Sequence, residues 1–103
     1  MQYIQVKSIP YQLGAEVRVL HFSDDGIWLT MGYSTFWQLK IEQIASISIE
    51  KTRQRLFGLI PSYSWLLIKT KNNDSYSEPL HDYPAKEIRV FVAYIHSQIE
   101  TVF

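Results

Sequence analysis

The 103-residue chain contains no cysteine, which excludes disulfide bonds and thiolate metal sites. No window holds the roughly 18–20 consecutive apolar residues of a membrane-spanning helix. Ten basic residues balance ten acidic ones, so the chain lacks the overall positive field typical of nucleic-acid-binding proteins. The N-terminal segment has neither the basic flank nor the apolar core of a signal peptide. These absences predict a soluble, cytoplasmic protein with no nucleic-acid partner.

What the chain does contain is enough apolar surface for one core. Apolar residues make up 47% of the sequence and aromatic residues 15%, which favours a packed globule over disorder. A chain of this length typically forms one domain, and it contains no internal repeat or linker. We therefore expect a single domain over residues 1–103.

Most of the chain has the two-residue period of β-strands. The clearest alternation covers residues 45–51, where Ile47 and Ile49 share one face and polar side chains the other, as in an antiparallel sheet with one wet face. Asp25-Gly26 favours a hairpin, because glycine accepts a positive φ. The other predicted strands are residues 16–22, 27–32, 35–40, 63–70, 75–78 and, at the N-terminus, 1–7.

The period changes after Pro79. Asp82 is a plausible N-cap and Pro84 suits the first turn of a helix. The apolar residues that follow have helical spacing and form one stripe. They are Ile88, Phe91, Val92, Ile95, Ile99 and Val102. An amphipathic helix over about residues 83–102 is therefore expected to pack on the sheet.

Four short motifs follow one another along the predicted strands: Leu-Thr-Met-Gly at 29–32, Ile-Ala-Ser-Ile at 44–47, Gln-Arg-Leu-Phe-Gly-Leu at 54–59 and Trp-Leu-Leu-Ile-Lys-Thr at 65–70. Together with the order of the predicted elements, these motifs resemble the bacterial pleckstrin-homology-like domains. The resemblance extends from about Val17 to Ile99. It implies a mainly β fold: an antiparallel barrel or sandwich of about seven strands, closed by one C-terminal helix.

The resemblance also implies a binding or assembly module, and several members of the family form symmetric oligomers. Two departures limit it. Many such domains adjoin transmembrane helices, which this chain lacks. Eukaryotic relatives bind phosphoinositides through basic residues in the first hairpin loop, whereas the matching turn here is acidic, with Asp24 and Asp25. The lipid-binding residues of the superfamily are therefore not carried over.

No catalytic, cofactor or metal site is predicted. His21, His81 and His96 lack metal-ligand spacing, and no serine lies in a nucleophile elbow. Asp24-Asp25 fits a turn better than a catalytic pair. The four glycines form no phosphate-binding loop.

Two interaction surfaces are predicted instead. Lys51, Arg53 and Arg55 alternate along an extended segment that leads into Phe57, and this basic-apolar combination suits either an anionic membrane surface or the closure of the barrel. Val90 and Tyr94 lie four residues apart, off the core stripe of the helix. With Trp28 or Phe36 on an outward sheet face, they form a second candidate patch.

The leading hypothesis is a non-enzymatic module that acts through protein–protein contacts, self-association included. One alternative is peripheral binding to anionic membranes through residues 51–60. A second alternative is a small-molecule site in the mouth of the barrel, which requires a deep pocket with convergent polar groups.

Overall fold

The structure is a computed structural model that describes residues 3–10, 14–53 and 62–102, and it gives no side-chain detail for residues 52, 53, 62, 63 and 100–102. Within these ranges the chain forms seven strands, a single-turn 3-10 helix and one α-helix. They are β1 (Tyr3–Lys7), β2 (Arg18–Ser23), β3 (Gly26–Met31), β4 (Ser34–Lys40), η1 (Ile41–Gln43), β5 (Ile44–Arg53), β6 (Ser62–Thr70), β7 (Ser75–Pro79) and α1 (Ala85–Val102).

The strands form two antiparallel sheets. The first sheet has the order β1-β2-β3-β4 and the second the order β5-β6-β7. The prediction of a mainly β fold of about seven antiparallel strands with one C-terminal helix is confirmed. The described strands pair as two separate sheets and not as one closed barrel.

Alternation along the strands builds the core. In the first sheet, Leu20 and Leu29 lie opposite each other in the register and are at most 1% exposed, while their neighbours in sequence point away from the core. In the second sheet, Ile47 pairs with Ile68, and both are buried. The predicted division of residues 45–51 into an apolar and a polar face is confirmed.

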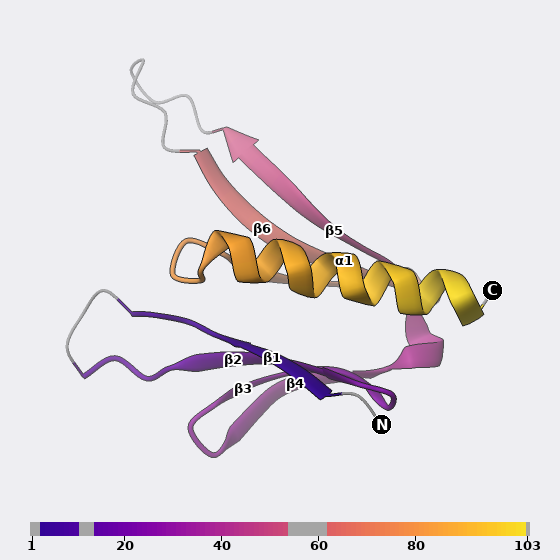
Figure 1. The fold of residues 1–103 in the computed structure, drawn as a ribbon, viewed down its shortest axis with the longest axis horizontal. Helices are drawn as coiled ribbons and strands as arrows, with labels where there is room; N and C mark the ends of the chain where they lie inside the picture. Colours follow the sequence, from indigo (N-terminus) through magenta and orange to yellow (C-terminus); the bar gives the residue numbers. More distant parts are fainter. Residues whose placement is uncertain (1–2, 11–13, 54–61, 103) are drawn as a thin grey trace.

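The helix closes the seam between the two sheets. It contacts β5 of one sheet and β1 of the other, and Figure 1 shows it lying between the four-stranded sheet and strands β5 and β6. Its apolar stripe supplies buried side chains, of which Phe91 and Ile95 are at most 1% exposed. Burying a large apolar side chain contributes roughly 1.5–3 kcal/mol before entropy is subtracted.

The N-cap of this helix is Pro84, so the prediction of Asp82 as the cap is wrong. The Pro84 carbonyl accepts the first helical hydrogen bond from the Ile88 N–H at 3.0 Å. Asp82 instead joins the approach to the helix to the first sheet, because its carbonyl accepts a hydrogen bond from the Ile9 N–H at 2.6 Å. Aspartate is a residue type that favours a local helix cap, but here Asp82 takes part in a tertiary hydrogen bond instead.

The predicted hairpin between β2 and β3 is confirmed, with Asp24 and Asp25 as its two turn residues. Gly26 begins β3 with a φ of 143°, a conformation that side chains rarely adopt. A Cβ atom at Gly26 would lie 1.9 Å from the Leu39 carbonyl oxygen of β4. The glycine therefore allows β4 to approach the end of the hairpin.

Candidate functional site

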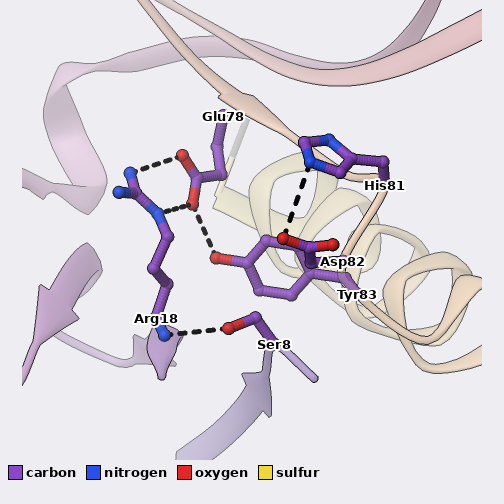
Figure 2. A network of polar contacts seen from close by, with 6 residues as sticks. All are labelled: Ser8, Arg18, Glu78, His81, Asp82 and Tyr83. Atoms are coloured by element: carbon purple, nitrogen blue, oxygen red, sulfur yellow. Dashed lines mark hydrogen bonds and ion pairs between the residues drawn. The ribbon is translucent and has the colours of Figure 1, made fainter. Parts of the chain in front are cut away.

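A buried polar network joins the two sheets to the segment before the helix. Glu78 of β7 is 1% exposed, and its carboxylate accepts hydrogen bonds from Arg18 Nε at 2.6 Å and Arg18 Nη2 at 2.7 Å. The Tyr83 hydroxyl donates to the same carboxylate at 2.6 Å. Figure 2 shows Arg18 and Tyr83 converging on Glu78, with Ser8 beside the backbone of Arg18. Each buried polar group in this network has a partner.

The network has the properties of a structural brace. The Arg18–Glu78 pair is bidentate, which is the strongest geometry for an ion pair between side chains. The hydrogen bond to Glu78 raises the pKa of Arg18, so the guanidinium stays charged. The Arg18 guanidinium also lies 4.8 Å from the centre of the Phe36 ring. These contacts fix the positions of the Arg18 and Glu78 charges.

The Tyr83 hydroxyl makes the stabilising effect of this network depend on pH in the alkaline range. Burial, followed by the hydrogen bond to Glu78, raises the pKa of Tyr83 above its ordinary value. The folded state therefore retains the Tyr83 proton at pH values where the unfolded chain loses it. This contribution to stability is complete below about pH 10, the ordinary tyrosine pKa, and is lost as the pH rises above it.

We expect Tyr83→Phe to lower the free energy of unfolding by about 1.5–3 kcal/mol at pH 7, the usual worth of a hydrogen bond to a charged group. The difference between wild type and variant should shrink from pH 9 to pH 11 in urea denaturation curves. Tyr33→Phe, at a fully exposed tyrosine, is the matched control. A difference that stays constant over this pH range would contradict the assignment.

A second cluster lies on the outer face of the first sheet. His21 stacks on Trp28, with ring centres 4.9 Å apart and an interplanar angle of 3°. The Tyr3 hydroxyl lies within hydrogen-bond distance of His21 Nδ1, and His21 Nε2 lies 2.8 Å from Thr30 Oγ1. Burial lowers the pKa of His21. The prediction that Trp28 faces away from the core is thus confirmed, and Trp28 is half-buried by its cross-strand neighbour.

The edge of the first sheet at β1 is open. β1 pairs with β2 on one side, and no described strand pairs with it on the other. Ser8, in continuous register with β1, donates its N–H to the Arg18 carbonyl at 2.8 Å. Hydrogen-bonded and non-hydrogen-bonded pairs alternate in antiparallel sheets, so the backbone groups of Tyr3, Gln5 and Lys7 point away from β2.

The other sheet edges in the described part of the chain carry features that blunt pairing. β4 is bulged opposite Leu29 and Thr30. β7 ends in Pro79, which has no N–H to donate. On β5, the carbonyl of Ile47 is bonded to the ring of His96 from the helix. β1 therefore presents the most regular open edge among the described strands.

A groove of about 480 Å³ runs along this edge. Its walls are β1, through Ile4, Gln5 and Val6, and the first turns of α1, through Val90 and Phe91. Val90 of the helix is 63% exposed. Tyr94, one turn further on, is half-buried and packs edge-on against Phe22 at 5.6 Å between ring centres. The two members of the predicted helix patch thus have different environments.

The predicted basic-apolar surface is only partly within the described residues. Lys51 is exposed at the end of β5 and lines a second cleft, on the opposite side of α1. The backbone of Arg53 belongs to β5, and its side chain lies outside the description. Arg55 and Phe57 lie outside the described residues. Phe36, proposed as part of an outward patch, is 48% exposed beside Arg18.

The three histidines have separate partners. His21 belongs to the aromatic cluster, His96 contacts the Ile47 carbonyl, and His81 Nε2 lies 3.5 Å from Asp82 Oδ2. In the described part of the chain, no group of three or more His, Cys, Asp or Glu side chains is arranged to hold a metal ion. No described helix has the length and apolar character needed to cross a membrane.

Two features of these surfaces were not predicted from the sequence. The Arg18–Glu78 pair joins residues 60 positions apart, and a single sequence contains no signal for such a pair. The open edge of β1 depends on strand order, although the strand itself was predicted. Comparison with protein-family models, with curated proteins and with solved structures found no match to this chain.

Proposed function

We propose that this chain is a non-enzymatic binding module of the pleckstrin-homology-like type, which acts through protein–protein contacts and forms a homodimer through the open edge of β1. The observation that carries the proposal is the regular edge of β1, which no described strand pairs with, beside the exposed Val90. Edge strands with free backbone groups pair readily with another strand.

The sequence of β1 is complementary to itself. If two copies pair in antiparallel fashion about a two-fold axis at Gln5, Tyr3 lies opposite Lys7 of the second copy. Gln5 then lies opposite its own equivalent, and the three residues whose backbone groups point outward form the hydrogen-bonded pairs. No like charges face each other in this register, which a self-pairing strand requires.

The inner face of β1 supports the same pairing. Ile4 and Val6 point toward the core side of the sheet, where Val6 is 4% exposed and Ile4 half-buried. In the paired arrangement, Ile4 and Val6 of the second copy enter the groove beneath Val90. The exposed valine then gains an apolar neighbour, as expected for the core of an interface.

The dimer is expected to be reversible, because one strand pair and one helix turn form a smaller contact than the 2,000 Å² or more of an obligate interface. Gln5→Lys places two lysines opposite each other across the axis, beside Lys7. We expect this variant to raise the dimer dissociation constant at least about tenfold, which corresponds to roughly 1.4 kcal/mol. Sedimentation equilibrium at several loading concentrations measures the constant.

Gln38→Lys is the matched control, because Gln38 is an exposed glutamine on β4 of the same sheet and receives the same charge. Its dissociation constant should equal that of the wild type. A strictly monomeric wild type at high concentration would overturn the homodimer. Equal weakening by both variants would remove β1 as the interface.

A further inference from the structure

The cleft on the other side of the helix has the form of a small-molecule site. Its volume is about 440 Å³, within the range of pockets that bind small organic ligands. It lies between β5, β6, the segment before the helix and the first turns of α1. Its lining is separate from the groove at β1, because the two cavities share no described residue.

The floor of the cleft is apolar. Leu80 and Ile88 contribute buried side chains, and Ile49 of β5 is half-buried beside them. A ligand with an alkyl or similar apolar body would remove this floor from water, at roughly 25 cal/mol for each Å² buried. A purely ionic ligand would leave the floor unused.

The rim of the cleft is basic. Lys51 of β5 and Arg89 of α1 are both exposed and both line the cleft, and no described carboxylate does so. Among the described residues, neither is part of an ion pair. Ser64 of β6 adds a hydroxyl group, and His81, which also lines the cleft, lies 3.5 Å from Asp82. Two cations and a hydroxyl group above an apolar floor favour an anionic head group.

We propose that this cleft binds a small amphiphile with one anionic head group, a phosphate or a carboxylate, at Lys51 and Arg89, and with its apolar body on Ile49, Leu80 and Ile88. Two basic side chains match one such head group, and the described rim has no further lysine or arginine for a second. This site goes beyond the proposed dimer and uses the opposite side of α1.

The test uses octyl phosphate, below its micelle concentration, as the probe in amide NMR titrations of the full chain. Octyl phosphate is expected to shift the resonances of residues that line the cleft. Octanol and inorganic phosphate, which each supply half of the chemistry, should bind at least tenfold more weakly. Lys51→Gln and Arg89→Gln should each raise the dissociation constant of octyl phosphate about fivefold or more.

Lys86→Gln is the control, because Lys86 is an exposed base on α1 that lines the β1 groove instead. The Lys86→Gln variant should bind octyl phosphate with the same affinity as the wild type. Octanol binding as tightly as octyl phosphate would overturn the proposal. So would equal weakening by Lys86→Gln and Arg89→Gln, or resonance shifts confined to residues outside the cleft.

A free amphiphile and a membrane lipid both carry an anionic head group on an apolar body. A vesicle experiment distinguishes these two kinds of ligand. Phosphatidylcholine vesicles with and without phosphatidylglycerol are sedimented with wild type and Arg89→Gln. Sedimentation that needs the anionic lipid and is lost in Arg89→Gln supports this site with a lipid as its ligand. Recovery of the wild type in the supernatant, alongside octyl phosphate binding, supports this site with a free ligand.

Discussion

Replacing Arg18 with alanine is expected to lower the free energy of unfolding by about 3 kcal/mol. The variant leaves the Glu78 carboxylate, which is 1% exposed, without its ionic partner. Removing one member of a buried pair typically costs 3–5 kcal/mol. We place the effect at the lower end because the Arg18 side chain is 37% exposed, so water can reach part of the vacated site.

Urea denaturation at pH 7 measures this loss, and two variants make the result specific. Arg89→Ala, at an exposed arginine, should change the free energy of unfolding by less than about 0.5 kcal/mol. The triple variant Arg18→Met, Glu78→Leu and Tyr83→Phe removes both charges and the hydroxyl group that Glu78 accepts from, and it should recover much of the lost stability. A loss no larger than that of Arg89→Ala would show that the pair does not brace the sheets.

Gly26→Ala is expected to destabilise the chain by about 3 kcal/mol or more. The substitution forces a side chain into a φ of 143°, and strained backbone of this kind costs about 1–3 kcal/mol. The new Cβ would also lie 1.9 Å from the Leu39 carbonyl oxygen, so β4 must move. Because β4 carries Leu39 into the core, that movement disturbs packing as well as pairing.

Thermal unfolding followed by circular dichroism measures the effect of Gly26→Ala. Gly32→Asn is the matched control, because Gly32 has a φ of 61°, where asparagine is tolerated. The nearest neighbour of a Cβ there is the end of the Glu16 side chain, at 3.4 Å. The control should cost less than about 1 kcal/mol. Equal effects of the two variants would mean that the close approach of Leu39 is unimportant.

The strands and the helix could be predicted from the sequence wherever one face of the element is buried and the other is exposed to solvent. Ile47 and Ile49 showed the period of β5, and Ile88 and Phe91 showed that of α1, because each pattern records which side meets the core. The start of α1 was placed too early. Aspartate is a residue type that often caps helices, but the Asp82 carbonyl bonds to the Ile9 N–H. A local residue preference cannot reveal such a distant partner.

The binding surfaces were less predictable, because each depends on how distant elements are brought together. The sequence indicated Lys51 as part of a basic strand, and the structure adds Arg89 from the helix across the same cleft. Val90 was correctly placed off the core stripe of the helix, but its neighbour at the groove is β1 rather than Tyr94. Neither pairing follows from spacing along the chain.

The Arg18–Glu78 pair also bears on the order in which this protein folds during synthesis. Its two residues are 60 positions apart, so the ribosome releases Arg18 long before Glu78 exists as a partner. The hairpins of β1 to β4 are local and can form early, but Phe91 and Ile95 of α1 cover their inner face last. Until then, the nascent chain exposes an apolar sheet with an open edge, the state in which aggregation and chaperone binding occur.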